Sequence, residues 1–427
     1  MKVDLNYGYT SISLNIPEKN LARMIEPWKQ PEARNAEVVA SALQCDEWET
    51  FCRRSAGKRL CVLLPDSSRD TPLKDIVPRL LPALRTCGRV DFIVCTGTHQ
   101  AQTPSNIAVL ENVKVAAERA GLHKCRFHIH DGEQDRLIDA GATAQGTRVF
   151  YNSFIEEADV FLVLSDVKVH YFAGYSNAIK YFVPGICGFE TAEKNHSLAL
   201  DNSATFGVHP WHSNIARTEN RLAQDQLEAM GLIVKERLVW AFVTVSTLGS
   251  IQWAQFGQAE EVTRAAFDVV DRQNAFMVEP VRYLIVSPGG MPNDVDLYIA
   301  QRALELTKAA VVDGGEVLFA AACPKGVGER QTTENFYELL TAPLDKIFAT
   351  VEANYRLFSH KPYKFAQLIA RLRRIWLYSQ ISDGIVESIH LSPAPQPQEV
   401  VDGWLAGEPQ AQIMVVNGAN KVALYAE

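Results

Sequence analysis

The chain has 427 residues, 47% of them hydrophobic and 22% charged, which is typical of a folded globular protein too long for a single domain. The formal net charge of −8 argues against a nucleic-acid partner, because phosphate binding needs concentrated Lys and Arg side chains. The sequence has no run of about 18 apolar residues to span a membrane. The polar–apolar alternation of residues 1–16 predicts a strand and not a signal peptide. We therefore expect a cytoplasmic protein that binds neither nucleic acid nor membrane.

Short apolar runs recur along the chain and are typical of strands covered on both faces of a parallel sheet. Amphipathic segments lie between them, most clearly at 73–84, 258–275 and 298–310. Strands that alternate with helices predict an α/β fold with largely parallel sheets. The expected strands are 59–65, 90–97, 158–166, 281–290, 315–322 and 411–418.

The amphipathic segment that ends at residue 275 separates two predicted domains. Residues 1–275 form the first and residues 276–427 the second, and each contains several of the expected strands. We therefore expect two α/β domains, each with its own sheet.

Polar residues follow three expected strands of the first domain at the point where each strand ends. They are the segments Asp66–Arg69, Thr96–His99 and Asp166–His170. Ligands of open α/β sheets bind beyond the carboxyl ends of the strands. The three segments are therefore candidates for one shared site.

Two of these segments carry residue types suited to catalysis or to anion binding. Two hydroxyls, free backbone N–H groups and Arg69 precede the expected helix and suit a phosphate or a carboxylate. They also fit an ordinary capped helix with a surface arginine. His99 can act as a general base near neutral pH, and it fits a structural loop histidine equally well.

The stretch 168–196 adds His170, Lys180 and His196. Lys180 lies inside an apolar run at 178–183, where partial desolvation lowers the pKa of an amine and favours a covalent role. A lysine that extends from an amphipathic helix to solvent fits the same pattern.

Together these motifs resemble the nickel-pincer lactate racemase family. The resemblance continues through most of the chain, including 253–262, 292–302 and 323–328. It implies two α/β domains with the active site in the cleft between them. The motifs, in order, are DSSR (66–69), TGTH (96–99), HYFAGYSNAIK (170–180), PGI (184–186) and NHS (195–197).

The resemblance implies an isomerase that inverts C2 of a 2-hydroxy acid by reversible hydride transfer. The implied hydride acceptor is a nickel-pincer nucleotide, the pyridinium-3,5-bisthiocarboxylic acid mononucleotide with nickel. Separate biosynthetic proteins supply this cofactor in the family. The first domain would bind it and carry out catalysis, and the second would contribute substrate contacts.

By motif position, Lys180 would tether the cofactor and His196 would bind nickel. His99 and His170 would be the acid and base of catalysis. Two acid/base groups suit a reversible inversion, because each must act as acid in one direction and as base in the other. The residues that would hold the nucleotide are Asp66, Ser67, Ser68 and Arg69, and those that would contact substrate are Arg69, Tyr298 and Arg302.

Departures from the family pattern lie in the substrate pocket. Ile299 and Arg302 stand where lactate enzymes have Gln and Lys, and Asn177 begins a triplet that is Gly-Gly-Arg in those enzymes. We therefore expect a substrate other than lactate. A 2-epimerase of sugar acids, acting on an aldonate such as gluconate, is the alternative, and Asn177 and Lys364 are polar residues that fit it.

Two other classes of function compete with an epimerase. A non-catalytic protein that binds a small acid or a nucleotide could keep the scaffold, but it has no need for Lys180, His196 and both acid/base histidines together. A nicotinamide-dependent dehydrogenase is disfavoured, because LLPDSSRD stands where a G-x-G-x-x-G turn would follow the first clear strand.

Overall fold

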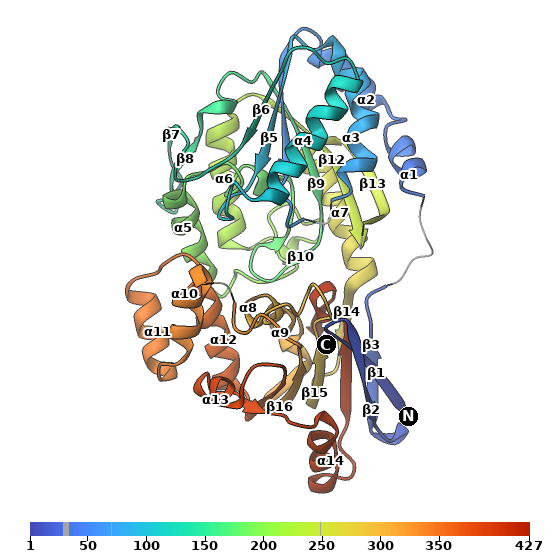
Figure 1. The fold of residues 1–427 in the computed structure, drawn as a ribbon, viewed down its shortest axis with the longest axis vertical. Coiled ribbons are helices and arrows are strands. Elements are labelled where there is room, and N and C mark those ends of the chain that lie inside the picture. Colours follow the sequence, from blue (N-terminus) through green and yellow to red (C-terminus); the bar gives the residue numbers. More distant parts are fainter. Residues whose placement is uncertain (29–33, 70, 248, 329) are drawn as a thin grey trace. The chain divides into compact units, whose positions relative to one another are not determined.

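The computed structural model describes residues 1–28, 34–69, 71–247, 249–328 and 330–427 (Figure 1). The chain divides into two compact units. The middle unit is formed by residues 29–272, and the terminal unit by residues 1–28 together with 273–427.

The middle unit is built on a six-stranded sheet in the order β13–β12–β9–β4–β5–β6. Neighbouring strands run parallel, except that β13 is antiparallel to β12. The strands are β4 (Arg59–Pro65), β5 (Arg89–Cys95), β6 (Cys125–Ile129), β9 (Val160–Asp166), β12 (Leu238–Thr247) and β13 (Ser250–Gln258).

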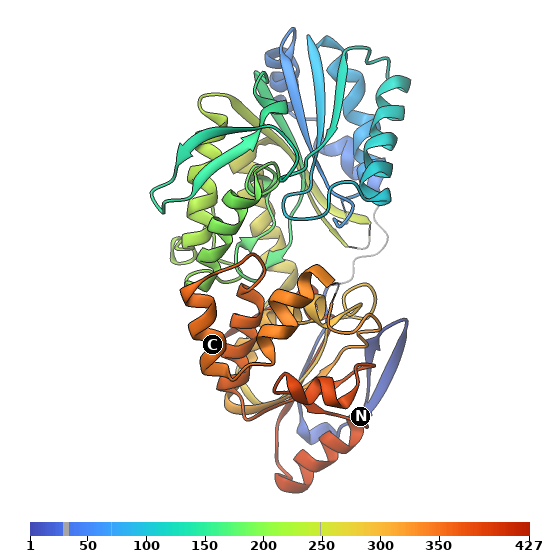
Figure 2. The same ribbon diagram turned by 60° about the vertical axis from the view of Figure 1, so that its left-hand side comes forward.

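Successive side chains of each strand point to opposite faces of the sheet, so the apolar strands supply a core on both faces. Leu60 and Val62 of β4 lie in one hydrophobic cluster with Phe51 of α2 and Ile76 of α3, whereas Phe161 of β9 contacts Phe182 outside that cluster. Short hairpins β7–β8 (Leu137–Ala142 and Arg148–Asn152; Figure 2) and β10–β11 (Val169–His170 and Gly174–Tyr175) complete the unit. Its helices are α1 (Asn35–Ala42), α2 (Asp46–Ser55), α3 (Leu73–Leu80), α4 (Pro104–Arg119), α5 (Phe189–Ser197), α6 (Arg221–Val234) and α7 (Ala259–Asn274).

The terminal unit contains a second six-stranded sheet, in the order β18–β17–β16–β15–β19–β3, with every neighbouring pair parallel. A β1–β2 hairpin (Lys2–Tyr7 and Thr10–Asn15) lies beside it (Figures 1 and 2), and β14 (Ala275–Val278) pairs with β20 (Ala423–Ala426). The sheet strands are β3 (Leu21–Ile25), β15 (Val281–Ser287), β16 (Val311–Ala320), β17 (Arg374–Tyr378), β18 (Ser392–Pro393) and β19 (Ile413–Asn417). The helices are α8 (Leu297–Ala300), α9 (Arg302–Thr307), α10 (Arg330–Leu340), α11 (Leu344–Ala353), α12 (His360–Arg371), α13 (Asp383–Ser388) and α14 (Pro397–Gly407).

The predicted α/β class with largely parallel sheets is confirmed. The structure differs from the predicted division at 1–275 and 276–427, because residues 1–28 group with the terminal unit. The physical reason is long-range pairing: β3 adds to β19 in parallel, and the hairpin buries Val3 and Leu5 in the core of that unit.

Local chain geometry also differs from the sequence pattern at three places. The strand expected over 1–16 is a hairpin that turns at Gly8, whose φ of +56° suits glycine. The helix expected over 73–84 ends at Leu80 and continues as a 3₁₀ turn, and 298–310 divides into α8, α9 and a 3₁₀ turn. No helix among the described residues is long and apolar enough to cross a membrane.

Phe242 of β12 is fully buried in the core of the middle unit. Phe242→Ala should lower the free energy of unfolding by about 3–5 kcal/mol, because it removes buried surface and leaves a cavity. Urea denaturation followed by circular dichroism measures this loss. Val115→Ala is the control, because Val115 is 42% exposed on α4, and it should change stability by less than about 0.5 kcal/mol. Equal losses in the two variants would contradict the core assignment.

Candidate active site

The site begins where the strand order of the middle sheet reverses. From β4 the chain moves outward through β5 to β6, and then returns to the other side of β4 with β9 and β12. Neighbouring parallel strands whose connections leave in opposite directions open a crevice at their carboxyl ends. Asp66 follows β4 at this edge, and Asp166 is the last residue of β9.

A small cavity of about 30 Å³ lies at this position. It is lined by residues from several segments that are distant in sequence, including Asp66, Arg69, Asp166, Ser176 and Lys180. The structure therefore brings the predicted nucleotide loop and the predicted tethering lysine together.

Asp66 Oδ2 accepts a hydrogen bond from His99 Nδ1. The Ser68 hydroxyl donates to the other carboxylate oxygen at 2.6 Å, and Arg69 lies 3.7 Å from it. Burial alone would raise the pKa of Asp66, but the hydrogen bonds and charges of these neighbours lower it to about 2. A carboxylate that accepts from Nδ1–H leaves the Nε2 lone pair of a neutral His99 available as a base.

The remaining residue of this loop, Ser67, has a structural partner. The Ser67 N–H donates to Asn106 Oδ1 at 2.9 Å, and Asn106 in turn donates to the carbonyls of Gln100 and Ala101. These bonds tie the loop after β4 to the segment that follows His99. They account for the placement of His99 beside Asp66.

Asp166 begins one of the three segments that the sequence placed at the site, but the sequence assigned it no role. The hydroxyls of Thr244 and Ser246 donate to its Oδ1 at 2.9 and 2.6 Å, and Lys168 Nζ lies 3.1 Å from Oδ2. The two hydroxyl donors come from β12, more than 70 residues away in the sequence. Its position at the end of a buried strand was the one available signal.

Lys180 lies in the 3₁₀ turn Ala178–Tyr181, which begins with Asn177. Asn177 is fully buried, and its Oδ1 accepts from the backbone N–H groups of Ile179 and Lys180 at 2.9 and 3.3 Å. Its amide nitrogen contacts the Tyr175 carbonyl and His209. Asn177 therefore shapes the lysine loop, a role different from the substrate contact that its polarity suggested.

His196 lies on α5 and is buried. Its Nδ1–H donates to the Ala192 carbonyl at 2.8 Å, which places the lone pair of a neutral ring on Nε2. Burial first, and then the nearby charges of Lys180 and His99, lower the pKa of His196 to about 4. A neutral imidazole whose other ring nitrogen is held by a hydrogen bond is the form that binds a metal ion.

His170 ends β10, and its Nδ1 accepts the Ala173 N–H at 3.3 Å. A neutral His170 therefore carries its proton on Nε2. The ring of Phe172 lies between His170 and His196. Its centroid is 4.5 Å from that of His170 and 5.4 Å from that of His196. Lys180 Nζ lies 5.7 Å from the same ring. Phe172 was not predicted, although its place in the 170–180 motif was a signal.

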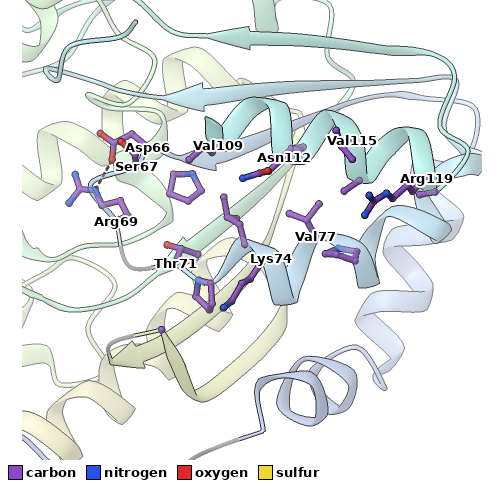
Figure 3. Close-up of a pocket in the computed structure, with 18 of the residues that line it drawn as sticks. Asp66, Ser67, Arg69, Thr71, Lys74, Val77, Val109, Asn112, Val115 and Arg119 are labelled. Carbon is purple, nitrogen blue, oxygen red and sulfur yellow. Dashed lines mark ion pairs between the residues drawn. The ribbon is translucent and has the colours of Figure 1, made fainter. Parts of the chain in front are cut away.

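A larger groove of about 1040 Å³ borders the Asp66–Arg69 loop and extends between α3 and α4 (Figure 3). Lys74, Asn112 and Arg119 contribute polar groups to it, and Val77 and Val109 contribute apolar ones. Among the described residues, no group of three or more His, Cys, Asp and Glu side chains forms a metal site.

The predicted substrate residues Tyr298 and Arg302 belong to the terminal unit. Burial raises the pKa of Tyr298, and Arg302 Nη2 donates to the Asn420 carbonyl at 3.2 Å. Lys361, which the sequence did not single out, donates to the Tyr298 carbonyl and lies 3.9 Å from the centroid of its ring. Lys364 is buried as well.

Residues 7–207 match the family model described as the lactate racemase N-terminal domain. Over this range, just under half of its length, the chain is similar to the lactate racemase family. The matched range contains all of the predicted residues of the middle unit, whereas Tyr298 and Arg302 lie outside it. Two curated proteins named lactate racemase also align with most of this chain.

The lactate racemase of Lactiplantibacillus plantarum is 24% identical over 434 residues, which cover 97% of each chain. That of Thermoanaerobacterium thermosaccharolyticum is 24% identical over 345 residues, 78% of this chain and 76% of the relative. The solved lactate racemase apoprotein from T. thermosaccharolyticum shares the fold, with a TM-score of 0.84, 18% identity and coverage of 99% of this chain and 100% of that one.

Asp66 also predicts a pH dependence of stability. The pKa of Asp66 in the folded protein, about 2, lies below its ordinary value of 3.8. The charged carboxylate therefore stabilises the folded state above pH 4, and this stabilisation is lost as the pH falls toward 2. Wild type should therefore lose about 1 kcal/mol more unfolding free energy than Asp66→Asn between pH 6 and pH 3. Urea denaturation at both pH values measures the difference. Asp345→Asn, at an exposed position of α11, is the control and should lose as much unfolding free energy between pH 6 and pH 3 as wild type. An equal loss in Asp66→Asn would refute the lowered pKa of Asp66.

Proposed function

We propose that the protein inverts the C2 centre of a 2-hydroxy acid by reversible hydride transfer, with a lysine-tethered nickel-pincer nucleotide as the hydride acceptor. The observation that carries the proposal is the convergence of Lys180, His196, His99 and His170 in the middle unit. A protein that only binds a small acid or a nucleotide needs no such set.

The chemistry of the donor set fits this cofactor. Lys180 offers an amine for the covalent attachment, and His196 offers an imidazole that is oriented by the hydrogen bond from Nδ1 to the Ala192 carbonyl and whose pKa is lowered to about 4. Soft sulfur donors together with an imidazole suit nickel. Arg69, beside the groove that borders its loop, supplies a guanidinium for the phosphate of a nucleotide. When bound, the group supplies an electron-poor ring that takes up hydride from C2.

The two catalytic histidines are prepared for opposite proton transfers. His99 has its Nδ1 bound to Asp66 and presents a basic Nε2, whereas the Nδ1 of His170 accepts from a backbone N–H and its Nε2 carries a proton. One imidazole can therefore take the proton of the C2 hydroxyl as hydride leaves C2, and the other can return a proton to that oxygen when hydride returns to the opposite face of C2. Reversal of the reaction exchanges the two roles.

The substrate is proposed to differ from lactate. Ile299, where lactate enzymes have a glutamine, is 39% exposed and offers no polar contact. Arg302 retains a cation and can bind a carboxylate in bidentate fashion. An aldonate such as gluconate, which makes the protein a sugar-acid 2-epimerase, is the second candidate, because the buried Lys361 and Lys364 add polar groups to the terminal unit.

Lys180→Ala should abolish covalent attachment of the cofactor, since no other amine takes part in the proposed tether. Intact-protein mass spectrometry and nickel analysis measure this on protein co-expressed with the cofactor-building enzymes. Wild type should gain the mass of the nucleotide at Lys180 and about one nickel per chain. Lys194→Ala, on the neighbouring helix α5, is the control and should keep the adduct. An adduct in Lys180→Ala would remove the lysine from this role.

His99→Ala and His170→Ala should each lower kcat for inversion by a factor of about 100 or more, because each removes one acid/base group. Nickel content and adduct mass should stay at the wild-type level. Chiral chromatography of a 2-hydroxy acid incubated in deuterated buffer measures inversion. His123→Ala, on the loop before β6, serves as the control. Near-normal turnover in either variant would exclude that histidine, and absence of both adduct and inversion in wild type would favour the non-catalytic binding protein.

A further inference from the structure

Phe172 contacts three of the four residues to which the proposed function assigns a role in the reaction. It lies in the turn of the β10–β11 hairpin and is 3% exposed. Its ring centroid is 4.5 Å from that of His170 and 5.4 Å from that of His196. Lys180 Nζ lies 5.7 Å from the same centroid. All four residues belong to the middle unit.

The ring of Phe172 meets both imidazoles edge to face. The angle between the ring planes is 83° for His170 and 72° for His196. Contacts of this kind are favourable for aromatic pairs and limit how each ring can turn. Tyr171 stacks on His170 at a centroid distance of 5.3 Å and an angle of 15°. The ring of His170 is therefore held by two aromatic neighbours.

The backbone of the turn that carries Phe172 is anchored to helix α6. Asn220 Nδ2 donates to the Phe172 carbonyl at 2.9 Å, and Asn220 Oδ1 accepts from the Ala223 N–H at 3.0 Å in the first turn of α6. Asn220 is itself buried. These bonds limit how far the ring of Phe172 can move from its place between the two histidines.

The two histidines beside this ring need to be kept apart for the proposed reaction. His196 binds the metal ion in that reaction, whereas His170 needs a ring nitrogen free to exchange a proton with the substrate. Imidazole suits nickel as a ligand. A second imidazole within reach of the ion would therefore become a ligand and lose its function as acid or base. The side chain of Phe172 has no donor atom, so it separates the imidazoles without competing for the metal.

We propose that Phe172 is a positioning residue that keeps His170 away from the nickel-binding position of His196 and so preserves His170 for proton transfer. This role rests on the proposed function and adds to it the side chain that separates the metal ligand from the acid/base group. Lys180 Nζ lies at cation–π distance from the same ring. The ring therefore also borders the point of cofactor attachment.

The first test uses nickel(II) alone as the probe. Tag-free, full-length apoprotein is titrated with the metal, and calorimetry measures its affinity. Phe172→Ala removes the ring and should bind nickel at least about tenfold more tightly than wild type, because two imidazoles can then hold one ion. A merely structural role predicts no such gain. The gain should disappear in the double variant Phe172→Ala/His170→Gln. No gain in Phe172→Ala, or a gain that persists in the double variant, would overturn the proposal.

A second comparison decides the same point even if Phe172→Ala fails to fold. With Phe172 in place, His196→Gln should weaken nickel binding by the apoprotein, whereas His170→Gln should leave it at the wild-type level. Equal losses in the two variants would show that both histidines already share the ion, and the proposed separation would be wrong. The same conclusion follows if His170→Gln alone weakens binding.

Cofactor-loaded protein supplies the third measurement. Phe172→Leu should lower kcat about tenfold or more by displacing His170, while KM changes less than about threefold. Adduct mass and nickel content should stay at the wild-type level. Phe154→Leu is the matched control and should keep the wild-type kcat. Phe154 also contacts a histidine and a cation away from the site, with His128 at 5.1 Å between ring centroids and Arg126 Cζ at 4.8 Å from its ring.

An unchanged kcat in Phe172→Leu would contradict the positioning role. Absence of inversion by loaded wild type would instead refute the proposed function. The nickel titrations of the apoprotein separate these two failures, because they need neither the cofactor nor the substrate.

Discussion

The parallel pairing of β4 with both β5 and β9 is the constraint on which the site depends. It places a reversal of strand order in the middle of the sheet, and the carboxyl ends on either side carry Asp66 and Asp166. Both carboxylates are buried and fully engaged by hydrogen bonds and charges from other segments. The strand ends determine where the polar loops begin. The hydrogen bonds of the Asp66 and Asp166 carboxylates then determine the conformation of those loops.

Buried polar contacts hold the reactive loops in place. Asn177 caps the turn of Lys180 and reaches His209, whose pKa burial lowers to about 3. On the other side of the turn, His130 Nε2–H donates to the Cys187 carbonyl at 2.9 Å and its Nδ1 accepts from Asn152. A buried histidine thus supports each end of the segment that carries the lysine. The loop is positioned by groups that take no part in the proposed chemistry.

The terminal unit repeats the architectural principle with different residues. Its reversal lies between β15 and β19, and part of that rim is covered by the N-terminal hairpin: Asn6 N–H donates to Asn417 Oδ1 at 2.9 Å and Gly8 N–H to Asp294 at 2.8 Å. These contacts span the length of the chain and explain why residues 1–28 group with residues 273–427.

Much of this protein follows from local patterns in the sequence. Continuous apolar runs predicted the sheet strands of both units, because a buried parallel strand needs apolar residues on both faces. Strand ends predicted the loops of Asp66, His99 and His170. The roles of Asp166, Phe172, Asn177 and Lys361 could not be predicted, because each depends on partners far away in sequence that only the packed chain brings near. The sequence by itself determined the α/β class and indicated the candidate site residues. The tertiary structure alone decided the unit to which residues 1–28 belong and the hydrogen-bond partners of each buried polar group, because these depend on long-range pairing and burial.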